Sequence, residues 1–89
     1  GTVPDASIEQ ANRLLIKKLI KHQLAGRGVE RYHQDHAACF QTAYAGTCLV
    51  FRDALDTCAL DQVRVAHIVQ AHLDMYVHPS HLALCTRRA

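Results

Sequence analysis

Residues 30–58 of the chain read ERYHQDHAACFQTAYAGTCLVFRDALDTC, and they decide how the rest of it folds. This stretch contains no proline and a single glycine, Gly46. On a helical wheel its apolar residues gather on one side, which is the pattern of an amphipathic helix with one buried face. We therefore expect a long central helix over residues 30–58. Because the apolar phase is the same on both sides of Gly46, we expect a close helix–helix contact there and no break.

The composition of the whole chain is that of a small globular domain. Its 89 residues are 49% hydrophobic and 20% charged, which fits one folded domain and not a disordered segment. No apolar run approaches the roughly 18–20 residues that a membrane-spanning helix needs. A chain of this size buries only a thin core, so a partner would help to stabilise it. We expect a soluble cytoplasmic protein with a single domain over residues 1–89.

The segments around the central stretch predict further helices. Ser7 and Gln10 fit a capping box, in which two side chains satisfy the free amides of a helix N-terminus. Glycines at positions 26 and 28 predict the end of that helix, and Asp61 is a good N-cap for another. The fold class is therefore all-α, a small helical bundle with a long central helix. The expected elements are a lead-in at residues 1–6, helices at 7–25, 30–58 and 62–77, and a short helix or turn at 79–85.

The apolar surface of the predicted helices exceeds what three small helices need to bury. The helix over residues 7–25 carries two apolar stripes, and the central helix adds apolar residues off its main face. Surplus apolar surface on a small domain usually marks an interface, and a symmetric homodimer is the commonest way to cover it. The leading prediction is a non-catalytic protein–protein interaction or self-association module. The expected contact residues are Ile16, Ile20, Leu24, Leu49 and Val50.

Two short motifs, one in each half of the chain, combine two histidines with a cysteine. Residues three and four apart share a helix face, so each motif could present its ligands together. If the chain folds back near residue 60 the two motifs would meet, and such a ligand set suits zinc or copper. The alternative is that these histidines are hydrogen-bonded in the core or exposed at the surface. The candidate metal ligands are His33, His36, Cys39, His78, His81 and Cys85.

A basic stripe on the first helix raises nucleic acid as an alternative partner. Its Lys and Arg side chains recur at helical spacing and could neutralise phosphates. The stripe can equally be the solvated face of a soluble helix. No aromatic residues interleave with these charges in the sequence, so stacking of single-stranded bases is not expected. The candidate nucleic-acid residues are Arg13, Lys17, Lys21 and Arg27.

The order of the expected elements is also that of a known arrangement. The first expected helix is followed by a loop with Arg27 and by the long segment Glu30–Cys58. A short piece at Val63–Val65 then precedes another helix. Over residues 8–76 this pattern resembles the histone-fold subunits of centromere and transcription complexes. The resemblance implies a handshake pairing of two subunits and a contact with DNA. A histone-fold-like, nucleic-acid-associated subunit is therefore a further alternative.

The sequence lacks the signatures of catalysis. It has no Gly-rich phosphate loop and no nucleophile elbow. With four cysteines and seven histidines, a cysteine will often lie near a histidine by chance, so their presence does not indicate a catalytic Cys–His dyad. We expect no enzyme activity and no required cofactor. Cys48 and Cys58 would stand about 15 Å apart on one helix, too far for a disulfide. Cys39–Cys85 is the one feasible bridge, and we expect free thiols in a reducing compartment.

Overall fold

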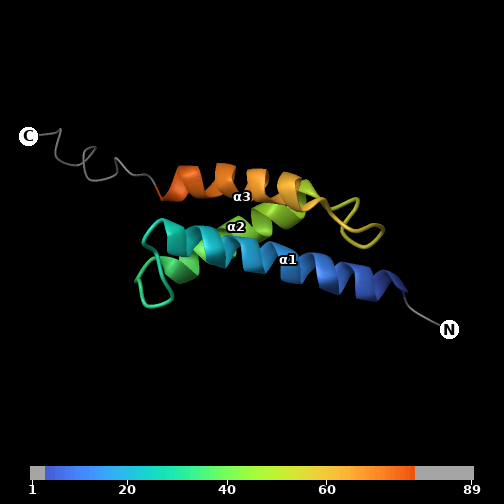
Figure 1. The fold of residues 1–89 in the computed structure, drawn as a ribbon, viewed down its shortest axis with the longest axis horizontal. Coiled ribbons are helices and arrows are strands. Elements are labelled where there is room, and N and C mark those ends of the chain that lie inside the picture. The colour runs from blue at the N-terminus through green and yellow to red at the C-terminus, as the bar shows by residue number, and fades with distance from the viewer. Residues whose placement is uncertain (1–3, 78–89) are drawn as a thin grey trace, which may run out of the picture.

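Residues 4–77 are described by a computed structural model, and in them three helices form a small bundle. Helix α1 spans Pro4–Gly26, α2 spans His36–Val50 and α3 spans Gln62–Tyr76. α1 and α3 run in one direction and α2 returns in the other (Figure 1), and each helix contacts the other two. The prediction of an all-α helical bundle is confirmed. None of these three helices is both long and apolar enough to cross a membrane. The short helix or turn expected at 79–85 lies outside the described residues.

The core lies between the three helices and consists mainly of aliphatic side chains. Ile16, Ile20 and Leu24, expected at a partner interface, are completely buried in it, and this corrects that expectation. Their stripe looked surplus because the sequence does not reveal that α2 and α3 both pack onto α1. Full burial of one such side chain contributes about 1.5–3 kcal/mol. The buried apolar residues are Ile16, Ile20, Leu24, Val29, Cys39, Ala43, Leu55, Val65, Val69 and Leu73.

Both ends of α1 have local causes. The helix begins at Pro4 and not near Ser7, so the expected capping box lies inside it. Proline suits a first helical turn because its missing N–H has no partner there. At the other end Gly28 has a left-handed φ of 83°, and the N–H of Val29 donates to the Leu24 carbonyl at 2.9 Å. This is the hydrogen-bond pattern of a Schellman end, and it confirms that the glycines terminate the helix.

The central helix is shorter than the sequence pattern predicts. The expectation of one helix over residues 30–58 is wrong at both ends, because α2 has 15 residues and turns occupy 31–35 and 51–57. At the C-terminal end Arg52 Nη1 donates to the carbonyl oxygen of Leu49 at 2.8 Å, which satisfies one of the last carbonyls of the helix. No glycine or proline lies at either boundary, so neither end of α2 carries a local stop signal.

A buried side chain from α1 holds the second connection in place. Asn12 is only 3% exposed. Its Nδ2 donates to the carbonyl oxygens of Leu55 (2.8 Å) and Cys58 (2.9 Å), and its Oδ1 accepts from the Leu60 N–H (3.0 Å). A buried amide is stable only when it is hydrogen-bonded, and this one is. These bonds hold residues 55–60 against α1, while residues 51–58 form turns through local hydrogen bonds.

α3 begins and packs as the sequence predicts. Asp61 caps it, since its Oδ2 accepts from the N–H of Arg64 at 3.2 Å. On the side facing α2, His72 lies against Gly46, and this confirms the predicted close contact at that glycine. Nδ1 of His72 is 3.1 Å from the hydroxyl of Tyr76, which holds the ring in position.

The element pattern of the histone-fold resemblance is not formed. That pattern needs a long central helix, whereas α1 with 23 residues is longer than α2 with 15. The piece Val63–Val65 lies inside α3 and does not precede it. The resemblance therefore carries no implication for subunit pairing or DNA contact in this fold.

Candidate functional site

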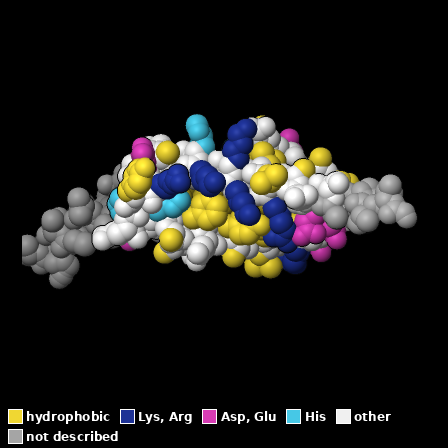
Figure 2. Space-filling view, turned by 90° about the horizontal axis from the view of Figure 1, so that it is seen from below, with side chains coloured by type: hydrophobic (Ala, Val, Ile, Leu, Met, Phe, Trp, Pro, Cys, Tyr) yellow, Lys and Arg dark blue, Asp and Glu magenta, His cyan; other side chains and the backbone are white. Residues whose placement is uncertain are grey.

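The face formed by α1 and α2 carries two rows of functional side chains. The first is the basic row of Arg13, Lys17 and Lys21, which follow one another every four residues along α1. Successive members are about 6 Å apart along the helix axis. Figure 2, which views the molecule from the α1 side, shows Lys and Arg side chains across this surface with hydrophobic atoms exposed between them.

The second row is an aromatic ladder on α2. Its members are His36, Phe40 and Tyr44, also four residues apart. Their rings stack in succession, with centroids 6.0 and 6.3 Å apart and planes 19° and 12° from parallel. All three side chains are half-buried. Rings with a buried body and an accessible edge are typical of protein interfaces.

The basic row and the aromatic ladder meet at Tyr44. Nη1 of Arg13 donates to the Tyr44 hydroxyl at 2.9 Å. The guanidinium carbon of Arg13 and Nζ of Lys17 lie 6.0 and 5.3 Å from the ring centroid, which are cation–π distances. No aromatic residue interleaves with these charges along α1, but the packing of α2 brings the Tyr44 ring beside them. The rings come from α2, and the shared four-residue spacing of the two rows was the sequence signal that could have found them.

Arg13 is the most constrained member of the basic row. Its Nε donates to Oε2 of Glu9 at 2.7 Å, and its Nη1 donates to the sulfur of Cys48 at 3.6 Å. The hydrogen bond to Tyr44, followed by that to Glu9, raises the pKa of Arg13 above its ordinary value. The guanidinium therefore stays charged and fixed, and within the described residues the two lysines of the row form no ion pair.

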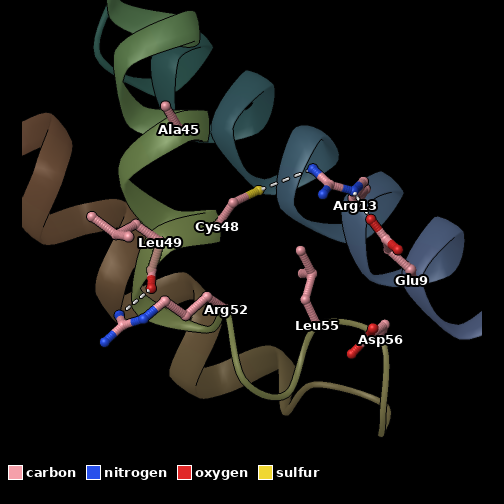
Figure 3. Close-up of a pocket in the computed structure, with 8 residues that line it drawn as sticks. All are labelled: Glu9, Arg13, Ala45, Cys48, Leu49, Arg52, Leu55 and Asp56. Atoms are coloured by element: carbon pink, nitrogen blue, oxygen red, sulfur yellow. Dashed lines mark hydrogen bonds and ion pairs between the residues drawn. The ribbon is translucent and has the colours of Figure 1, made fainter. Parts of the chain in front are cut away.

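A hollow of about 390 Å³ lies at the Arg13 end of the face (Figure 3). Residues of α1, of α2 and of the turn after α2 line it. Leu49 and Leu55 contribute apolar surface, and Glu9 and Asp56 place carboxylates at its rim. Arg13 and Arg52 also line it, so the hollow combines an apolar lining with charges of both signs.

A second hollow of about 540 Å³ lies at the opposite end of the face. Lys21 and His36, which end the two rows, take part in lining it. The connection between α1 and α2 adds Glu30, Arg31 and Tyr32, and the Tyr32 side chain is 92% exposed. The two rows are thus bounded by a hollow at each end, and each hollow is lined by both carboxylate and basic side chains.

Two of the five expected partner-contact residues are accessible. Leu49 is 61% exposed and lines the first hollow, and Val50 is half exposed at the end of α2. The remaining three are the buried α1 residues described above. A contact role for Leu49 and Val50 stays a prediction.

The first histidine–cysteine motif does not form a metal site in the described part of the chain. No group of three or more His, Cys, Asp or Glu residues between 4 and 77 is arranged to hold an ion. His33 lies in the turn before α2, where its Nδ1 accepts from the N–H of Asp35 at 3.0 Å. Cys39 is buried, and burial, followed by the Asp35 charge, raises its pKa. His78, His81 and Cys85 lie outside the described residues, so zinc or copper binding by the combined set stays a prediction.

Arg27, the fourth candidate nucleic-acid residue, belongs to another part of the bundle. Its Nη2 pairs with Oδ1 of Asp74 at 2.8 Å, and its Nη1 donates to the carbonyl oxygen of Val77 at 3.1 Å. These bonds tie the end of α1 to the end of α3. Of the four basic candidates, Arg13, Lys17 and Lys21 share the α1–α2 face and Arg27 does not.

Comparison with known proteins gives no relative of this chain. No protein-family model, no curated protein and no solved structure matches it. The geometry of the α1–α2 face is therefore the basis for a functional proposal.

Proposed function

We propose that this chain is a small, non-catalytic helical module that binds another protein through the α1–α2 face. The observation that carries the proposal is the basic row lying against the aromatic ladder, with a hollow at each end. Arginine and aromatic side chains are enriched in protein interfaces, and the strongest contacts are made where an anchor side chain fills a hollow. The exposed side chain of Leu49 adds an apolar contact at one end.

The chemistry around the face supports binding over catalysis. A nucleophilic thiol needs a lowered pKa, whereas burial raises the pKa of Cys39. Arg13 already donates to Glu9, Tyr44 and Cys48, so it acts as a structural tie between α1 and α2.

The charge of the face favours a different protein over a second copy of this chain. Two copies that met through this face would bring two basic rows together, and like charges across an interface are unfavourable. The homodimer expected from the sequence also depended on Ile16, Ile20 and Leu24, which are buried in the core. The proposed partner therefore has an opposite, negative charge on its contacting surface.

Selection from a displayed library of random peptides tests the proposal, because accessible interfaces capture such peptides preferentially. We expect the enriched peptides to shift the backbone amide resonances of α1 and α2 in the full 89-residue chain. Leu49→Glu, at an exposed position in the first hollow, should abolish their binding.

Met75→Glu is the matched control, because Met75 is 68% exposed but lies on α3. It should leave peptide binding unchanged. Enriched peptides that bind as well to Leu49→Glu as to the unmodified chain, or that lose binding with Met75→Glu, would overturn the assignment of the face. A library that yields no binder would also count against it.

A further inference from the structure

We infer that the partner of the α1–α2 face is an acidic amphipathic helix, which lays a row of carboxylates along the basic row and an apolar stripe along the aromatic ladder. This inference rests on the proposed function and adds the chemistry and shape of the partner. It follows from the spacing of the two rows, from the groups at their ends and from the orientation of the Tyr44 ring.

The spacing of the basic row fits a helix. Arg13, Lys17 and Lys21 present a positive charge once per turn of α1. A partner helix with Asp or Glu at every fourth residue repeats its charges at the same interval of about 6 Å. Docking of an amphipathic helix along a surface between two helices is a recurrent mode of protein recognition. A peptide that binds by adding a strand to a sheet edge has no site here, because residues 4–77 form no strand.

The second row fits the same partner. In a helix, residues three and four apart lie on one face, so an acidic stripe and an apolar stripe can run side by side. The half-buried rings of the aromatic ladder lie alongside the basic row at matching intervals. The apolar stripe would therefore pack on the rings while the carboxylates reach Lys17 and Lys21, whose ammonium groups pair with no carboxylate in the described residues.

The ends of the face carry charges of both signs, which suits a protein helix of varied sequence. Glu9 and Asp56 lie at one hollow together with Arg13 and Arg52, and Glu30 lies at the other together with Lys21 and Arg31. A nucleic-acid strand carries a charge on every phosphate and would meet these carboxylates at both ends. A protein helix can instead place apolar or basic residues there and keep its acidic residues in the middle. The exposed Leu49 side chain offers an apolar contact in the first hollow.

The orientation of Tyr44 also disfavours a nucleic acid. Single-stranded binding uses open ring faces on which bases stack. In this chain the cationic groups of Arg13 and Lys17 lie over the Tyr44 ring, and the ring of Phe40 stacks next to it. Carboxylates need no open ring face, because they pair with the ammonium and guanidinium groups themselves.

Three synthetic helical peptides of about four turns test the inference against the full chain. All three carry the same leucine stripe. Every fourth residue in the row beside this stripe is Glu in the first peptide, Gln in the second and Lys in the third. We expect the Glu peptide to bind at the α1–α2 face, the Gln peptide to bind about tenfold more weakly, and the Lys peptide not to bind. Binding of the Glu peptide should also weaken with added salt, because the charges are exposed.

Variants of the chain locate the charges that matter. Replacing Lys17 and Lys21 together by Ala should lower the affinity of the chain for the Glu peptide about tenfold. Lys18→Ala is the matched control, because Lys18 is an exposed lysine on the same helix but outside the basic row. It should change the affinity by less than about twofold. Circular dichroism of each variant checks that the helices are retained.

The possible results separate the inference from the proposed function. Equal binding of the Glu and Gln peptides at the α1–α2 face would contradict the acidic partner and leave the protein-binding face intact. Tighter binding of an oligothymidine strand than of the Glu peptide, lost in the Lys17/Lys21 double variant, would replace the protein partner by a nucleic acid. If none of the peptides binds and the displayed library also yields no binder, both proposals fail.

Discussion

The imidazole of His72 occupies the space that a side chain at position 46 would fill. An ideal Cβ built on Gly46 would lie 2.9 Å from Nε2 and 3.0 Å from Nδ1 of His72. The ring cannot turn away freely, because its Nδ1 pairs with the hydroxyl of Tyr76. α2 and α3 therefore approach each other as closely as they do because position 46 carries no side chain.

Gly46→Ala should destabilise the domain. Alanine in place of a helical glycine would by itself stabilise α2 by roughly 1 kcal/mol. The added methyl group must displace His72, and overpacking of this kind costs about 1–3 kcal/mol. We expect a net loss of about 1 kcal/mol in the free energy of unfolding, measured by urea denaturation. In a chain that carries His72→Ala, the added methyl group should be favourable. If Gly46→Ala with His72 intact is more stable than the unmodified chain, the packing described here is contradicted.

Asn12→Leu should destabilise the domain more strongly. Leucine is similar in size but leaves the carbonyls of Leu55 and Cys58 and the N–H of Leu60 without their partner. A buried polar group left unsatisfied costs about 1–3 kcal/mol. Only the bond to Leu55 is buried, and water can partly replace the part-buried bonds to Cys58 and Leu60, so we expect a total loss of about 2–4 kcal/mol. In the Asn12→Leu variant, the amide hydrogen of Leu60 should be the first to exchange faster with solvent. An unchanged exchange rate there would mean that Asn12 does not hold the connection.

Thr47→Val should stabilise the domain. Thr47 is completely buried, and within the described residues its Oγ1 has no hydrogen-bond partner. Replacing the hydroxyl by a methyl group of similar size removes an unsatisfied polar atom, which we expect to add about 1 kcal/mol. For a domain of this size that raises the midpoint of thermal unfolding by about 4–8 °C. The control is Thr42→Val at an exposed position of the same helix, where the change should stay below about 0.5 kcal/mol.

The cysteines should differ in their reaction with iodoacetamide. The thiolate is the reacting form, and burial raises the pKa of Cys39, so this residue is both less ionised and less accessible. We expect exposed Cys58 to be alkylated at least about tenfold faster at neutral pH, as measured by peptide mass spectrometry. Alkylation of Cys39 should still be rising above pH of about 8.5, the ordinary value for a thiol. In concentrated urea the difference between the two should vanish, and its persistence there would point to a cause other than the fold.

The parts of the fold that could be predicted are those with local causes. The glycines after α1 and the cap at Asp61 act through hydrogen bonds within a few residues, and the sequence identifies both. The contact at Gly46 was predictable because the apolar phase continues across it. The length of α2 could not be predicted, because no glycine or proline marks its ends. The path of the chain after it could not be predicted either, because it is bonded to Asn12, more than forty residues away in the sequence.

The candidate site could be predicted only in part, for a related reason. The spacing of Arg13, Lys17 and Lys21 predicts that they share a helix face, and they do. The helical-wheel pattern places Phe40 and Tyr44 on the apolar side of the central stretch, but the spacing within one helix does not indicate which neighbouring helix that side will meet. Only the packing of α1 against α2 sets the rings beside the charges.

The two connections of the bundle should respond differently when the chain is cut. The end of α1 is closed by bonds among its own last residues, so a peptide of α1 with Gly28 and Val29 carries everything that closes this end. The loop after α2 forms turns through local hydrogen bonds, but Leu55, Cys58 and Leu60 in its second half are also bonded to Asn12 of α1. A fragment that contains only α2, this loop and α3 would lack that side chain. The helical hairpin at the C-terminal side is therefore a product of the whole bundle, and the domain should unfold as one cooperative unit in which α1 is the template.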